Sequence, residues 1–153
     1  MADENRASYE DANLILRLYE LRREETMREA RKWYVSEFFP ETAEDIKEIF
    51  PPTHPHNAHF RMVVPYWDMA ASFAVRGPLS ADLLLESATE LLLVWAKIEP
   101  FIAEIRESAR LPEYLRNLEA IAERVEWAPA RIKWLKHRFA LFRAQKAQTA
   151  EET

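Results

Sequence analysis

Apolar residues recur at intervals of three and four along most of the chain, which is the spacing of helices that bury one face. Such stripes cover residues 9–38, where Ser8 can cap the first turn and Pro40 stops the helix. We therefore predict one long N-terminal helix over residues 9–38. Further stripes, separated by prolines, predict helices over residues 42–50, 57–76, 80–110, 112–125 and 129–147.

Two prolines, Pro65 and Pro100, lie inside these predicted helices. A proline within a helix removes a backbone hydrogen bond and bends the helix, so we expect a kink near each of them. The predicted fold class is all-α, an irregular bundle of five to seven helices with a long N-terminal helix and proline kinks.

No domain linker interrupts the 153 residues, so we expect a single helical domain over residues 1–153, with residues 1–7 and 148–153 frayed. The predicted N-terminal helix would be about 45 Å long, whereas a compact globule of this length is about 40 Å across. A helix that is longer than the body can pair with a copy of itself. We therefore expect a homodimer.

The chain has one glycine, Gly77, and no cysteine. Glycine-rich phosphate loops and nucleophile turns need more glycines, while disulfides, thiol nucleophiles and Cys-ligated metals need cysteine. This composition removes several classes of enzyme. Gly77 stands between a predicted helix and Pro78, so we expect it to end that helix with a positive φ.

Charge is unevenly distributed along the chain. The formal net charge is −5, yet residues 129–146 carry six Lys and Arg residues and no Asp or Glu. An acidic protein lacks the overall charge of a nucleic-acid-binding domain, so we expect no nucleic-acid partner. The longest strongly apolar run, Leu91 to Ala96, is far shorter than the ~20 residues of a membrane span. The acidic N-terminus is unlike a signal peptide, and we expect a cytoplasmic protein.

A series of motifs runs from Phe60 to Glu123. In order, these are Pro65-Tyr66-Trp67-Asp68, Gly77 to Leu83, Trp95 to Ile102, Arg106, and Pro112 to Glu119. Together with the run from Met27 to Trp33, the series resembles an uncharacterised family of bacterial helical proteins that is classed as a domain of unknown function. The resemblance implies an all-α domain, and it implies no activity, substrate or catalytic residue.

Three histidines, His54, His56 and His59, lie within six residues of a proline-rich loop. Imidazole binds Zn²⁺ and Ni²⁺, but no Cys or obvious carboxylate nearby completes a tetrahedral set of ligands. The three residues are therefore weak metal candidates, and a solvated loop is the favoured alternative. We predict no metal and no cofactor.

Asp68, Glu90 and Glu99 each interrupt an apolar run. A buried carboxylate needs a partner or its pKa rises, and this is how many functional sites are made. Arg76 and Arg106 are the natural partners. The candidate small-molecule site consists of Tyr66, Trp67, Asp68, Arg76 and Trp95. The favoured alternative is that these carboxylates form structural ion pairs or face solvent.

Residues 131–146 carry the sharpest pattern, an apolar helical face opposite a wholly basic one. The apolar residues are Ile132, Trp134, Leu135, Phe139, Leu141 and Phe142. Such a helix can lie on anionic lipid or enter the groove of a partner protein. The candidate contact residues are Arg131, Lys133, Trp134, Lys136, Arg138, Phe142 and Arg143. The alternative is a last bundle helix whose cations balance the acidic remainder.

The chain carries no motif that identifies a catalytic residue, so an enzymatic activity is not expected. We predict a non-enzymatic helical module that binds another protein and forms a homodimer. Two alternatives stay open. One is peripheral binding to an anionic membrane through residues 131–146. The other is a small-molecule binder or enzyme with a pocket around Trp67 and Asp68.

Overall fold

The computed structural model describes residues 6–153 and confirms the all-α fold. The described residues form nine α-helices and one 3₁₀ turn, more than the five to seven helices predicted. The first four are α1 (Tyr9–Arg22), α2 (Glu25–Ser36), α3 (Ala43–Lys47) and α4 (Asn57–Val75). They are followed by α5 (Ala81–Ser87), α6 (Glu90–Ile98), η1 (Glu99–Phe101), α7 (Ile102–Ala109), α8 (Arg116–Arg124) and α9 (Ala128–Glu151).

We predicted that residues 1–7 and 148–153 at the two ends of the chain are frayed. Most of the N-terminal stretch, residues 1–5, lies outside the described residues. At the other end, α9 continues to Glu151, into the stretch for which we predicted a frayed tail.

The single long helix predicted over residues 9–38 is wrong, because the chain breaks between α1 and α2. The carboxylate of Glu24 accepts the backbone N–H groups of Thr26 (3.1 Å) and Met27 (3.0 Å) and so starts α2 as a new helix. A side chain that caps the following turn competes with continuation of the helix before it. The charged residues at this point therefore form a junction between two helices.

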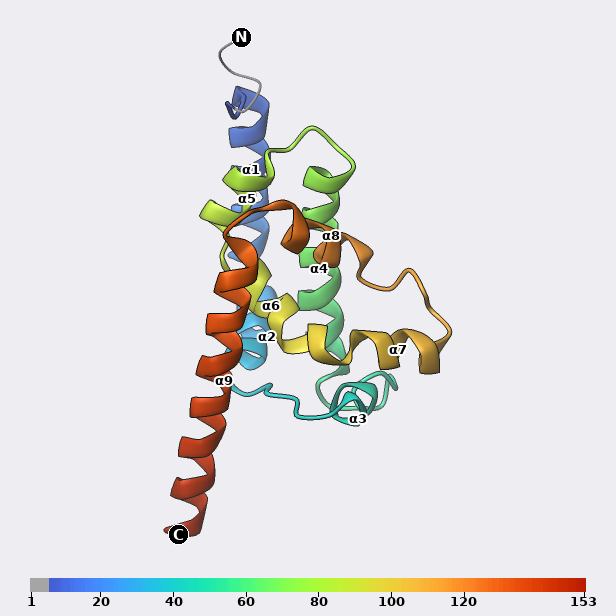
Figure 1. Ribbon diagram of the computed structural model, residues 1–153, viewed down its shortest axis with the longest axis vertical. Helices are drawn as coiled ribbons and strands as arrows, with labels where there is room; N and C mark the ends of the chain where they lie inside the picture. The colour runs from blue at the N-terminus through green and yellow to red at the C-terminus, as the bar shows by residue number, and fades with distance from the viewer. Residues whose placement is uncertain (1–5) are drawn as a thin grey trace.

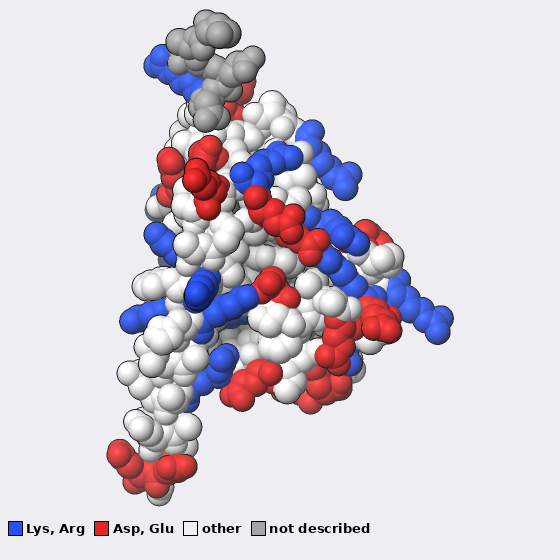
Figure 2. All heavy atoms as spheres, in the orientation of Figure 1, with Lys and Arg blue, Asp and Glu red and all other residues white. Residues whose placement is uncertain are grey.

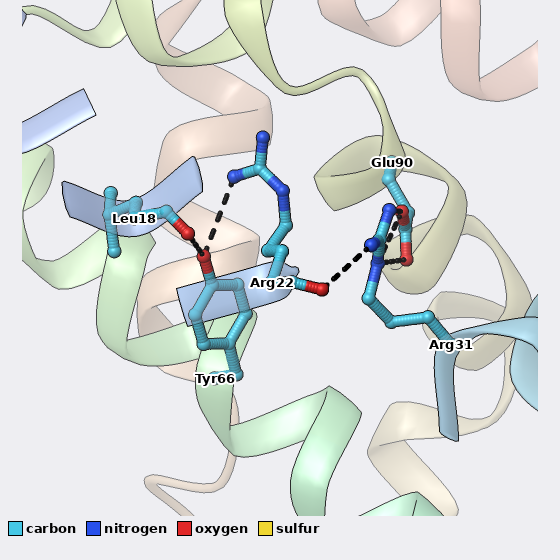
Figure 3. A network of polar contacts seen from close by, with 5 residues as sticks. All are labelled: Leu18, Arg22, Arg31, Tyr66 and Glu90. Carbon is cyan, nitrogen blue, oxygen red and sulfur yellow. Dashed lines mark hydrogen bonds and ion pairs between the residues drawn. The ribbon is translucent and has the colours of Figure 1, made fainter. Parts of the chain in front are cut away.

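A network of polar contacts holds this junction against α4 and α6 (Figure 3). The Tyr66 hydroxyl, from α4, donates to the Leu18 carbonyl at 2.5 Å, and it accepts from Arg22 at 3.4 Å. Arg31 of α2 donates to the Arg22 carbonyl at 3.3 Å and forms an ion pair with Glu90 of α6 at 2.6 Å. The end of α1 is thus fixed by side chains from two other helices.

The two prolines inside the predicted helices, Pro65 and Pro100, lie in different kinds of helix. α4 continues through Pro65, so this proline does not end the helix. Pro100 lies in η1, where the chain passes from α6 into α7 through a 3₁₀ turn. A 3₁₀ turn tolerates proline near its start, because the first N–H groups of a helix lack partners within it.

The core is organised around α4, which contacts α2, α8 and α6. Trp67 of α4 is fully buried, as are Tyr34 of α2 and Leu118 of α8. α6 contacts α9, which runs along one side of the body, and the last turns of α9 project beyond it (Figure 1). The body of the protein is therefore α1 to α8, with α9 laid against it.

Gly77 does not have the positive φ that we predicted. A Cβ atom at this position would lie 2.7 Å from the Phe73 carbonyl oxygen, so the glycine is needed for space. That oxygen is held in place by the N–H of Leu79 at 3.1 Å. The positive φ values in residues 6–153 belong to Arg110 (57°) and Leu115 (58°), which flank α7 and α8.

Cations from other helices occupy the C-terminal ends of several helices. Arg124 of α8 donates to the carbonyls of Ala74 (2.7 Å) and Val75 (3.4 Å) at the end of α4. Lys97 of α6 does the same at the end of α2, as described below. The last carbonyls of a helix lack hydrogen-bond donors within it and carry partial negative charge. A cationic side chain both donates to these carbonyls and compensates their charge.

Candidate functional site

The five residues of the candidate small-molecule site serve mainly in packing and capping. Trp67 is fully buried and Trp95 is 3% exposed, so both rings belong to the core. Tyr66 closes the end of α1, and Arg76 is exposed at the end of α4. These side chains therefore offer little common surface to a ligand.

Asp68 acts as an N-cap that reaches α8 from another helix. Its carboxylate accepts the backbone N–H of Leu118 and the side-chain amide of Asn117, both at 3.1 Å. Leu118 lies in the first turn of α8, where N–H groups lack partners and a negative charge is favourable. Leu115, the residue before α8, has a left-handed backbone conformation, and its side chain does not cap the helix. Asp68 therefore supplies the cap.

The other two carboxylates form ion pairs, but not with the expected partners. Glu90 pairs with Arg31, and Glu99 pairs with Lys136 of α9. Arg106 pairs instead with Glu119, at 3.0 Å. The expectation that Arg76 and Arg106 would be the partners was wrong, because Arg106 faces Glu119 and Arg76 is exposed.

The three histidines form a stack of rings rather than a common metal site. The ring of His56 stacks on Trp33, with centroids 4.8 Å apart, and lies 5.9 Å from the ring of His59. The Nδ1 atom of His54 accepts the backbone N–H of His56 at 3.1 Å. Within residues 6–153, no three His, Asp or Glu side chains come together as metal ligands.

The basic helix does not have one apolar and one basic face, contrary to the sequence prediction. Ile132 and Phe139 are buried against the body, whereas Trp134 is 54% exposed and Leu141 is 48% exposed. At 100° per residue, Trp134 and Leu141 lie on the side of α9 opposite Ile132. Apolar residues therefore lie on both sides of α9.

The predicted contact residues of α9 divide between its two sides. Lys136 and Arg143 face the body, where they line a pocket, and Phe142 stacks on Phe39 with centroids 4.6 Å apart. The remaining predicted contact residues are exposed: Arg131, Lys133, Trp134 and Arg138. Arg131 and Arg138 each lie 5.7 Å from the Trp134 ring as cation–π partners.

Lys97 is the residue with the most unusual environment, and the sequence analysis missed it. It is 3% exposed, and its Nζ donates to the carbonyls of Tyr34 (2.6 Å), Val35 (3.2 Å) and Phe38 (2.6 Å). The ring of Phe39 lies 3.8 Å from Nζ. An available signal was that Lys97 is the single cation in the apolar run of α6.

The environment of Lys97 disfavours its positive charge. Burial lowers the pKa of Lys97 from 10.5 to about 7, and the nearby cations Lys146 and Arg143 act in the same direction. The three carbonyls oppose this shift, because their partial negative charges favour the ammonium form. Lys97 is thus a structural cap whose charge is costly at neutral pH.

A pocket of about 370 Å³ opens next to Lys97, between α6, α9 and the turn after α2. Lys97, Lys136 and Arg143 line it together with Glu41, and phenylalanine and proline side chains complete its walls. Its volume lies at the lower end of the range for ligand pockets, roughly 300–1,000 Å³. The combination of cations and apolar walls suits a small ligand with a negative end.

Residues 7–127 match the family model of a domain of unknown function, DUF4760. The chain belongs to this family. No curated protein and no solved structure matches it. None of the helices within residues 6–153 has both the length and the apolar character needed to cross a membrane.

The DUF4760 match ends immediately before α9 begins at Ala128. The matched residues therefore contain α1 to α8, and α9 follows them. The pocket beside Lys97 has walls from both parts, because Lys97 belongs to the DUF4760 region while Lys136 and Arg143 belong to α9.

Proposed function

We propose that this DUF4760 protein is a helical interaction module that forms a homodimer, and that the outward side of α9 is the interface. The observation that carries the proposal is the exposure of Trp134 and Leu141 on the side of α9 turned away from the body. Large apolar side chains in line on an exposed helix are typical of interaction surfaces. The proposal assigns no catalytic residue.

The charges of α9 favour antiparallel pairing with a second copy. Positive side chains gather along the upper and middle part of α9, and negative ones at its C-terminal tip (Figure 2). Arg131 lies ten residues before Leu141, and Glu151 lies ten residues after it. If two α9 helices cross antiparallel at Leu141, each Arg131 lies at the same height along the helix as the partner's Glu151, within reach of these long side chains. Because a two-fold interface places the same residues on both sides, one complementary pair occurs twice.

The length of α9 is sufficient for such a contact. From Arg131 to Glu151 the helix rises about 30 Å, at ~1.5 Å per residue. The last turns of α9 project beyond the body, so a second copy can approach them without meeting α1 to α8 (Figure 1). An isolated helix end of a few turns is marginal in water, and pairing would stabilise it.

Binding to an anionic membrane is the less favoured function for α9. A helix that lies on lipid needs its apolar residues on one face and its cations around the other. In α9 the buried apolar face packs on the body, and Lys136 and Arg143 face the body too. Trp134 and Leu141 are the large apolar residues that stay available to lipid on the outward side, and Phe142, which is 37% exposed, stacks on Phe39.

Sedimentation equilibrium of the full chain tests the dimer. We expect the wild type to show a reversible monomer–dimer equilibrium, and Leu141→Asp to weaken it at least tenfold, because two carboxylates would meet at the crossing point. Leu111→Asp is the matched control, since Leu111 is 43% exposed and lies between α7 and α8. A wild type that is monomeric at about 100 μM, or equal weakening by both variants, would refute the proposed interface.

A further inference from the structure

The pocket beside Lys97 contains an excess of positive charge. Three cations line it, Lys97, Lys136 and Arg143, and Lys146 lies next to it over the ring of Phe39. The carboxylate in the lining is Glu41, and Glu99 reaches Lys136 from outside. Cations therefore outnumber carboxylates at this site.

The three lining cations have different capacities to hold a ligand. Lys97 already uses its donors on the carbonyls at the end of α2, and Lys136 is paired with Glu99. Arg143 has no hydrogen-bond or ion-pair partner within residues 6–153. Its guanidinium is a planar fork that can donate two parallel hydrogen bonds to a carboxylate.

The rest of the pocket is apolar. Phe39 and Phe139 meet edge to face, with centroids 5.9 Å apart, and Phe101 and Pro100 also line the pocket. Aromatic and proline walls favour a flat apolar group over a fully hydrated ion. A ligand for this pocket therefore needs a negative end and an apolar body.

We propose that this pocket binds a small aromatic monocarboxylate, with its carboxylate on Arg143 and its ring against Phe39 and Phe139. One free guanidinium favours a carboxylate over a phosphate, which carries more charge and needs more donors. The bound carboxylate compensates the charge of Lys97, which is held there by the end of α2 without an acidic partner. The site is separate from the outward side of α9, so it does not depend on the dimer.

The test is a titration of the full chain with sodium benzoate, followed by NMR of the aromatic side chains. We expect saturable shifts of the Phe39 and Phe139 resonances. Arg143→Gln should raise the dissociation constant at least tenfold. Arg138→Gln, which removes the same type of charge from the outward side of α9, should change it less than twofold. Neutral benzyl alcohol and phenyl phosphate should each bind at least tenfold more weakly than benzoate.

Each arm of the titration can contradict the proposal. Equal binding of benzyl alcohol would show an apolar cavity without recognition of charge. Tighter binding of phenyl phosphate would overturn the assignment to a carboxylate. Equal effects of Arg143→Gln and Arg138→Gln would show only general attraction to a basic helix. The absence of saturable shifts at Phe39 and Phe139 would show that the pocket does not bind this class of ligand.

Discussion

The body of the protein and α9 differ in whether their charged groups have partners. In α1 to α8, half-buried charged groups have partners from other helices, as with Arg31 and Glu90 or Asp68 and the start of α8. In α9, large apolar residues stay exposed on one side and an unpaired cation, Arg143, faces a pocket on the other. The body also exposes large apolar side chains, Leu16 and Tyr19 of α1 among them, so the clearest difference is the unpaired cation of α9 that faces a pocket.

This difference indicates where function lies in the molecule. Partners for polar groups are what stability requires, so the capping and paired residues of the body have structural explanations. Exposed apolar groups and unpaired cations cost stability or solubility, so they are the groups to examine for binding. Both proposals accordingly rest on α9, which follows the part of the chain that matches DUF4760.

The largest effect within the body is expected for Lys97→Met. This change keeps a long side chain but leaves the carbonyls of Tyr34, Val35 and Phe38 without their shared donor. We expect the free energy of unfolding to fall by roughly 2–4 kcal/mol, as measured by urea denaturation with circular dichroism. Lys133→Met, on the exposed surface of α9, is the control and should change it by less than about 0.5 kcal/mol. A loss below about 1 kcal/mol for Lys97→Met would mean that the end of α2 is not closed by Lys97.

The pH dependence of stability tests the same lysine by another route. The pKa of Lys97 is about 7 in the folded protein, against 10.5 as the ordinary value. Between these values the unfolded chain binds a proton that the folded protein does not, so stability rises with pH. We expect a gain of about 3 kcal/mol between pH ~7 and ~9.5 in the wild type.

The pH experiment has its own control. Burial also raises the pKa of Tyr34 and Tyr114, but those groups affect stability only above pH ~10, so they do not disturb this range. The free energy of unfolding of Lys97→Met should rise less with pH than that of the wild type, because the titration of the lysine is removed. Parallel profiles for the two proteins would show that Lys97 titrates normally.

A smaller effect is expected at Gly77. A methyl group there would meet the Phe73 carbonyl oxygen at 2.7 Å, and the backbone must shift to relieve the contact. We expect Gly77→Ala to lower the free energy of unfolding by roughly 2 kcal/mol, within the usual cost of overpacking. Thermal denaturation followed by circular dichroism measures this. A neutral result would show that the Phe73 carbonyl can move freely.

The smallest effect has the opposite sign. Arg110 ends α7 with a φ of 57°, a conformation that glycine adopts without strain. We expect Arg110→Gly to raise the free energy of unfolding by about 0.5 kcal/mol, after the extra entropy of glycine in the unfolded chain is counted. Chemical denaturation of the two proteins side by side resolves this difference. Destabilisation by more than about 1 kcal/mol would mean that the Arg110 side chain has a role in the body.

Local features of the fold could be predicted from the sequence. Ser8 caps α1 as expected and forms a capping box with Asp11, Thr42 with Asp45 forms a second box at α3, and Ser80 caps α5. These signals work because a cap depends on residues three positions apart in the chain. The helical periodicity also predicted the all-α class, because it too depends on residues three and four positions apart in the chain.

Features that depend on contacts between distant residues could not be predicted. Gly77 needs space because of where the Phe73 carbonyl lies, and sequence shows only that glycine permits a positive φ. Lys97 in its apolar run gave a signal, but the carbonyls that hold it are about sixty residues away. The prediction of one apolar and one basic face on α9 failed, because the periodicity does not say which apolar residues the body covers.

The proposed pairing of Arg131 with the partner's Glu151 is the most direct test of the account, and sedimentation equilibrium of charge-swapped variants measures it. Arg131→Glu alone and Glu151→Arg alone should each weaken the dimer severalfold, because each places like charges opposite one another. The protein that carries both substitutions should regain the dissociation constant of the wild type within about twofold, since the pair is restored in reverse. Additive weakening in the double variant would contradict the antiparallel α9 interface.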